Sequence, residues 1–199
     1  MTQATAVRSL PTVGRWDVGE LEALHSSVSF DVLHSAVTTF RSGFAGFDAS
    51  FDAKARKFTG TVKLDTLQCF DLLRQRLFEE DFFDAAHHPN IVFESTSIDE
   101  HGNGLIVDGN LTMKGVTKPV RATGTTHGTA QVFHPWSKTV HEHMGVDLQL
   151  TIDRRDFEVS FNNELPDGRM NLGYTVVINL ALDFACAEPI AQQQQEQNA

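Results

Sequence analysis

The sequence contains few cysteines and no long apolar run. Its 199 residues include two cysteines, Cys69 and Cys186, which lie far apart and outside any metal-binding or redox spacing. Such a pair predicts two reduced thiols in a reducing compartment and excludes a disulfide scaffold. No stretch reaches the length of a transmembrane helix, so stable insertion into a membrane is not expected.

Basic residues are also scarce. Lys and Arg together number 16 against 26 Asp and Glu, which gives a net charge of -10. Nucleic-acid binding requires a basic surface that neutralises phosphates, so this balance argues against a nucleic-acid partner. Residues 1–14 contain one Arg and no apolar run, which predicts that they are not a signal peptide and that the protein is cytoplasmic.

Hydroxyl-bearing aromatic residues are almost missing, because the chain has one tyrosine against 15 phenylalanines. An interior built from these residues has much aromatic surface and few hydroxyl groups. That composition suits an apolar ligand, although a large packed core has the same composition. The chain is long enough to bury such a core without disulfide or metal cross-links.

What dominates the sequence is an alternation of apolar and polar residues with a period of two. It predicts antiparallel strands that have one buried and one solvated face. Eight segments show it: 28–32, 45–51, 58–64, 91–98, 105–113, 120–124, 144–152 and 174–184.

One segment has helical spacing instead. Between residues 66 and 83 the apolar side chains fall at three- and four-residue intervals, and Pro89 ends any helix before the next strand. The predicted fold is therefore all-β, an eight-stranded antiparallel β-barrel with one α-helix inserted after the third strand. Closure into a barrel removes exposed strand edges. An eight-stranded barrel is either filled by side chains or holds one small ligand, and the sequence leaves both open.

The boundaries of the domain follow from composition. Residues 1–15 are predicted to be an N-terminal extension, residues 16–186 the barrel domain, and residues 187–199 a disordered Gln-rich tail. Gly102-Asn103-Gly104 predicts a turn between two of the later strands.

Histidines gather in one short stretch, at His127, His134, His141 and His143. His141 and His143 have the i, i+2 spacing that places two side chains on one strand face, where they can bind a metal. The stretch 127–141 nevertheless lacks a strand pattern and is predicted to be a loop, and no Glu or Cys completes a known spacing. Solvated loop histidines are the favoured interpretation, and no metal site is predicted. The acidic residues are scattered, so no catalytic pair is assigned either.

Four groups of residues, in order along the chain, resemble the YceI family of lipocalin-like barrels that bind polyisoprenoid lipids. The match extends over roughly residues 16–184. It departs from the family at two positions: Arg76 stands where the family has a His, and Glu158 where it has a Gly. The matching segments are 16–18 with 25–34, 81–84 with 88–95, 109–120, and 152–157.

The resemblance implies that the chain binds a long-chain isoprenoid lipid of the quinone or polyprenyl phosphate type in the barrel interior, for transport, storage or sequestration. It implies no catalytic residues and no cofactor other than the bound lipid, and it implies a homodimer. One polar group at the mouth would orient the lipid head, with His34, Arg76, Arg154 and Arg155 as candidates. The expected ligand-binding residues are Phe30, Val32, His34, Phe51, Phe58, Val62, Arg76, Phe82, Phe93, Leu111, Met113, Leu148, Leu150, Arg154, Val176 and Ile178.

Two alternatives stand beside lipid binding. One is an enzyme that acts on a hydrophobic substrate in the cavity with a metal held by the His-rich loop 127–143. The other is a dimerising structural module.

Overall fold

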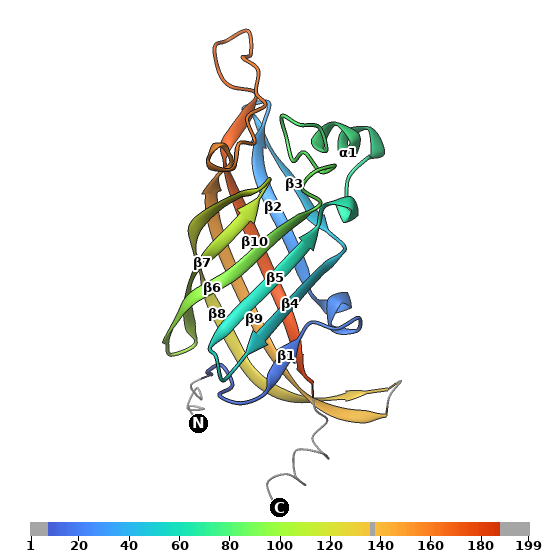
Figure 1. The fold of residues 1–199 in the computed structure, drawn as a ribbon, viewed down its shortest axis with the longest axis vertical. Coiled ribbons are helices and arrows are strands. Elements are labelled where there is room, and N and C mark those ends of the chain that lie inside the picture. The colour runs from blue at the N-terminus through green and yellow to red at the C-terminus, as the bar shows by residue number, and fades with distance from the viewer. Residues whose placement is uncertain (1–7, 136–137, 188–199) are drawn as a thin grey trace, which may run out of the picture.

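Antiparallel strands form the wall of the molecule in a computed structural model (Figure 1), which describes residues 8–135 and 138–187. Each strand pairs with its neighbours through an antiparallel ladder, as the alternation predicts. The strands are β1 (Arg15–Asp17), β2 (Ser27–His34), β3 (Thr38–Phe44), β4 (Phe47–Asp52), β5 (Lys57–Lys63), β6 (Asn90–His101), β7 (Gly104–Met113), β8 (Val116–His134), β9 (Thr139–Asp153) and β10 (Leu172–Cys186).

Eight of these strands close into a barrel. The strand order is β1-β4-β5-β6-β7-β8-β9-β10, and β1 also pairs with β10, which completes the ring. The three-residue strand β1 joins the two sides through Trp16, which faces Phe51 on β4 and Cys186 on β10. Beyond β1, the β2–β3 hairpin continues the wall on the same side of β10. The fold expected from the sequence, an eight-stranded antiparallel barrel, is confirmed.

One α-helix, α1 (Asp71–Leu77), lies between β5 and β6 at one end of the barrel (Figure 1). It follows the third of the predicted strands, but β1 and β3 precede it as well. Short 3-10 helices occur at η1 (Glu22–His25), η2 (Leu64–Thr66) and η3 (Arg154–Phe157). The helix is shorter than the spacing over 66–83 predicts, because the chain from Phe78 to His88 continues in turns whose amides bond locally. No helix of the described residues is long and apolar enough to span a membrane.

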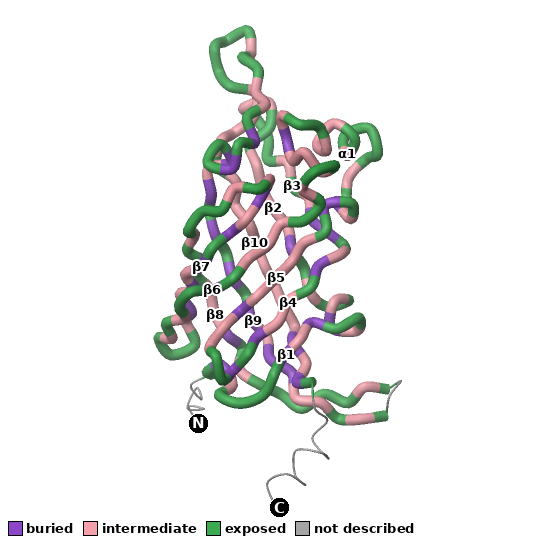
Figure 2. Tube along the Cα trace, in the orientation of Figure 1, coloured by how far each residue is buried: buried purple, intermediate pink, exposed green. Residues whose placement is uncertain are grey.

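The barrel end around β1 is packed solid. Trp16, Phe51 and Phe184 are at most 2% exposed, and the Phe51 and Phe58 rings lie 4.5 Å apart. Buried and half-buried positions run along the barrel strands, whereas much of α1 is exposed (Figure 2). Leu10, in the predicted N-terminal extension, is also buried, and its amide donates to the Glu100 carboxylate. The predicted disordered tail lies almost wholly outside the described residues.

The stretch 127–141 is not the predicted loop. β8 and β9 extend past the barrel as a paired hairpin, in register from Gly128 opposite Gly145 to His134 opposite Thr139. We call residues 128–134 and 139–145 the arm. It projects from the end of the barrel remote from α1 (Figure 1), and the ladder shifts register between Thr126 and Gly128, where it begins. Few of its residues are buried, and the exceptions on β9, His143 and Met144, lie where that strand still pairs with β10.

Candidate ligand-binding cavity

The barrel is hollow between its packed end and α1. A cavity of about 670 Å³ runs inside the strands, within the range of ligand pockets. Most of its lining side chains are aliphatic or aromatic, because the inward positions of the alternating strands carry them. The structure thus decides between the filled and the hollow barrel that the sequence allows.

All but one of the residues expected to contact a ligand line this cavity. Phe51 is the exception: it belongs to the packed end, is fully buried and stacks on Phe58. The structure brings together the other expected residues, Phe30, Val32, His34, Phe58, Val62, Arg76, Phe82, Phe93, Leu111, Met113, Leu148, Leu150, Arg154, Val176 and Ile178. Their contact with a ligand remains a prediction.

The sequence did not identify several aromatic and aliphatic residues of the lining. Phe40 and Phe44 lie on β3, which was not recognised as a strand, and Phe161 lies in an irregular segment after η3. Phe161 stacks on Phe82 at a centroid distance of 4.9 Å. The sequence DFF at 81–83 indicated one side of this contact, but nothing local to Phe161 indicated the other.

α1, β3 and β4 all contribute residues to the cavity lining. α1 contributes Leu73, Arg76 and Leu77 to the lining. In the described part of the chain no ladder joins β3 to β4, and residues of both strands, among them Arg41 and Asp48, line the cavity. A ligand can therefore enter without breaking a ladder of the closed ring.

Arg154 is the polar group best placed to contact a ligand. It is 5% exposed, and its Nε and Nη1 donate to the carbonyl oxygens of Gly173 and Val159 at 2.9 and 2.5 Å. Its Nη2 is buried and has no hydrogen-bond partner among the described residues. Burial lowers the pKa of this guanidinium from its usual value, since desolvation disfavours the charged form. A buried donor without a partner is costly, so an acceptor oxygen of a ligand would be favoured here.

Arg76 also lines the cavity, but its charge is already paired. Nη1 and Nη2 donate to both oxygens of Asp81 at 2.6 and 2.7 Å, and Nη1 also meets Glu79 at 2.6 Å. The Arg76 hydrogen bond holds the pKa of Asp81 below its usual value. The guanidinium lies over the rings of Phe82 and Phe161, at 4.7 and 4.3 Å from their centroids. Arg76 thus ties α1 to the segment that follows it.

The remaining head-group candidates are less buried. His34 is exposed at the end of β2, where its Nδ1 contacts the Ser35 hydroxyl at 3.0 Å. Arg155 does not line the cavity, and its guanidinium is bound to Asp153. Hydrogen bonds from Arg155 lower the pKa of Asp153 to about 2.

One group of three side chains in the described ranges has the arrangement of metal ligands: Glu22, His134 and His143. None of the three lines the cavity. The pair that converges is therefore His134 with His143, and not His141 with His143 as the i, i+2 spacing suggests. Glu22 was not identified because it lies more than 100 residues earlier in the chain.

Bacterial proteins with similar sequences include relatives from Shewanella and Salmonella. The chain is 34% identical over 124 residues to "UPF0312 protein Sputw3181_1309" of Shewanella sp. (strain W3-18-1), covering 59% of this chain and 64% of that protein. The match thus spans just under two thirds of the Shewanella protein. "Protein YceI" of Salmonella newport is 28% identical over 145 residues, covering 70% of this chain and 73% of that protein.

Solved structures share the fold. "Burkholderia cenocepacia BcnA" aligns with a TM-score of 0.64 at 22% identity, covering 81% of this chain and 97% of that one. A polyisoprenoid binding domain from Saccharophagus degradans, "implicated in plant cell wall breakdown", aligns with a TM-score of 0.61 at 12% identity, covering 87% and 99%. A family model described as "YceI-like domain" matches residues 20–184, most of the barrel, and the chain belongs to this family.

Proposed function

We propose that this protein binds a long-chain isoprenoid lipid of the quinone or polyprenyl phosphate type, with the tail in the barrel cavity and the head at Arg154. The observation that carries the proposal is an apolar cavity of about 670 Å³ lined by Arg154, whose Nη2 is buried and has no hydrogen-bond partner among the described residues. Apolar walls and a single placed polar group are the usual design of a site for an amphipathic small molecule.

The free energy for binding comes from the tail. Transfer of each methylene from water into an apolar site contributes ~0.8 kcal/mol, so several isoprene units outweigh the loss of translational and rotational freedom. The walls are largely fixed by strand ladders, which limits the ordering cost. A related fold in a protein described as a polyisoprenoid binding domain supports this class of ligand.

The head group is the part that Arg154 would select. Its free Nη2 requires an acceptor, and a quinone carbonyl or a phosphate oxygen supplies one. A phosphate would also neutralise the charge, since no described carboxylate forms an ion pair with Arg154.

We propose a carrier or storage role in place of catalysis. The enzyme alternative placed a metal from the stretch 127–143 at the cavity, but His134 and His143 lie outside the lining. The lining cations are instead bonded to carbonyl groups or paired with carboxylates, an arrangement that positions a ligand.

Native mass spectrometry of the protein purified from its own host, followed by solvent extraction and lipid identification, tests the proposal. We expect a bound mass of isoprenoid character at about one per chain. A protein that stays free of ligand after incubation with both a prenylated quinone and a polyprenyl phosphate would overturn it.

A further inference from the structure

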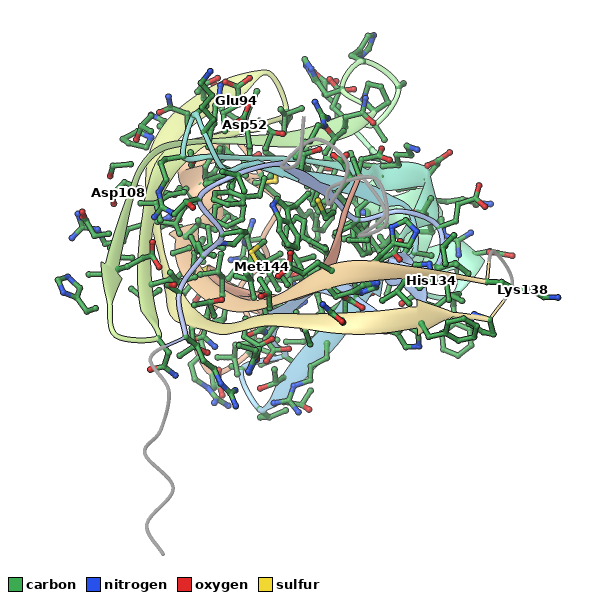
Figure 3. All side chains as sticks on the ribbon, turned by 90° about the horizontal axis from the view of Figure 1, so that it is seen from below. Asp52, Glu94, Asp108, His134, Lys138 and Met144 are labelled. Atoms are coloured by element: carbon green, nitrogen blue, oxygen red, sulfur yellow. The ribbon has the colours of Figure 1, made fainter. Side chains whose placement is uncertain are left out.

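A second cluster of polar side chains lies outside the barrel cavity, where the arm meets the N-terminal segment. Glu22 belongs to η1, His134 to β8 and His143 to β9. Seen along the barrel, His134 lies on the arm with Lys138 near its tip (Figure 3). Long-range folding alone brings Glu22 to the two histidines.

Glu22 and His143 are buried and His134 is half-buried, and the candidate ligand atoms of the three lie within 4.8 Å of one another. Glu22 is 5% exposed and His143 8%. The two Nε2 atoms of His134 and His143 lie 2.7 Å apart, and Glu22 Oε1 lies 3.5 and 3.8 Å from them. In the plane of these three atoms, the point equidistant from them lies about 2.0 Å from each, which is the length of a zinc–nitrogen or zinc–oxygen bond.

Few protons are available for the hydrogen bonds of this cluster. His143 Nδ1 lies 2.8 Å from Asp183 Oδ1, and a carboxylate only accepts, so a neutral His143 carries its proton on Nδ1 and a lone pair on Nε2. Glu22 Oε1 presents a second lone pair. One proton on His134 Nε2 would have to serve both acceptors, whereas a cation at the centre satisfies all three atoms.

The surroundings hold the ligands in place. Asp183 orients the His143 ring, an arrangement typical of metal-bound histidines. The Ser26 hydroxyl donates to the Glu22 carbonyl oxygen and accepts from the Asp183 amide, both at 2.9 Å, which joins η1 to β10. A Cβ on Gly19 would lie 2.6 Å from Glu22 Oε2, so glycine leaves the carboxylate its room.

We propose that Glu22, His134 and His143 bind one divalent transition-metal ion, with Asp183 as the positioning residue for His143. Two imidazoles and one carboxylate suit Zn²⁺ and its neighbours in the first transition row, whereas Mg²⁺ and Ca²⁺ prefer oxygen ligands. Three protein ligands leave a coordination position for water. The bound ion would fasten the arm to η1 independently of the lipid cavity.

Titration of the metal-stripped full-length protein with Zn²⁺ tests this site by calorimetry, and Co²⁺ supplies an absorption spectrum that reports nitrogen ligation. We expect one ion per chain and a raised thermal midpoint with Zn²⁺. His134→Ala and His143→Ala should each weaken binding about 100-fold or more, and Asp183→Asn by roughly 10- to 100-fold. Mg²⁺ should not bind at the same concentrations.

His127 provides the matched control. It lies on the same strand as His134 and pairs with Asp147 at 2.8 Å, yet it is outside the cluster, so His127→Ala should bind Zn²⁺ as the unaltered protein does. Circular dichroism checks that each variant folds, and Glu22→Gln, which keeps the side-chain size, replaces any histidine variant that does not. Absence of stoichiometric binding by the unaltered protein, or full binding in Glu22→Gln and the folded histidine variants, would overturn the proposal.

Discussion

At the residue scale, Arg154 is the side chain whose chemistry most restricts the ligand. Replacement by Met keeps the length and apolar stem but removes the guanidinium, whose Nη2 is buried and has no partner among the described residues. We expect Arg154→Met to weaken binding of a prenylated ligand about tenfold or more, as loss of a charged hydrogen bond costs roughly 1.5–3 kcal/mol. The measurement is a titration of quenched Phe or Trp fluorescence with a quinone and with a polyprenyl phosphate.

The adjacent Arg155 separates this effect from a general loss of charge. Its side chain is 57% exposed and bound to Asp153 outside the cavity. Arg155→Met should leave the affinity within about twofold, because surface ion pairs contribute little. Equal losses in the two variants would show that Arg154 does not contact the head group.

Glu158, one of the two departures from the family pattern, has a backbone conformation that favours glycine. It ends η3 with a φ of 59°, in the left-handed region, where the resemblance noted in the sequence leads one to expect a glycine. This conformation costs an L residue about 1–2 kcal/mol and costs glycine nothing sterically. We expect Glu158→Gly to raise the free energy of unfolding by roughly 0.5–1 kcal/mol in urea titrations.

The control for that substitution is Glu158→Ala. It removes the same exposed side chain but keeps the Cβ, so no gain is expected. The contact from Lys114 Nζ is to the Glu158 carbonyl oxygen at 2.7 Å, and both variants retain it. A gain of equal size in Glu158→Ala would mean that the side chain, and not the backbone, is responsible.

At the element scale, α1 is the least anchored part of the cavity wall. None of its residues is fully buried, and Phe70 and Leu72 at its start are 89% and 81% exposed. A seven-residue helix is too short to be stable without packing. We expect its amides to exchange with deuterium much faster than those of β9, and a bound lipid to slow them because Leu73 and Leu77 line the cavity.

Hydrogen-exchange mass spectrometry with and without lipid measures this difference. Peptides from β7 and β8 within the barrel serve as the reference, and their exchange should change little. Protection of α1 equal to that of β9 without ligand would show that the helix is a fixed part of the wall.

The elements that the sequence predicted well are those with one face in the barrel. Burial alternates along β7 and along residues 144–152 of β9, because inward side chains meet the interior and outward side chains point away from it. β3 lies at an edge of the sheet, and most of the arm extends beyond the barrel, so burial on one face patterns these segments less regularly. Glu22 joins His134 and His143 only through tertiary folding, and no local spacing can indicate such a contact.

At the scale of the whole molecule, the two ends of the barrel differ in packing. Trp16, Phe51 and Phe184 fill the end near β1, whereas the inward residues toward α1 leave a cavity. β1 closes the ring of ladders at the packed end, whereas at the hollow end no ladder among the described residues joins β3 to β4. The phenylalanine-rich composition therefore supplies both the packed core at one end of the barrel and the apolar cavity wall at the other.

A large side chain placed in the cavity tests whether the lipid occupies that volume. Leu148 lines the cavity, and its neighbour Gln149 points outward to Asn179. In a packed core an added ring lowers the free energy of unfolding by about 1–3 kcal/mol. In a hollow barrel Leu148→Trp should change the free energy of unfolding by less than about 1 kcal/mol. The same substitution should lower lipid occupancy at least tenfold. Gln149→Trp adds the same ring outside and should keep full occupancy by native mass spectrometry. Strong destabilisation by Leu148→Trp would mean that the cavity closes in solution, while normal occupancy in a stable Leu148→Trp variant would place the lipid elsewhere.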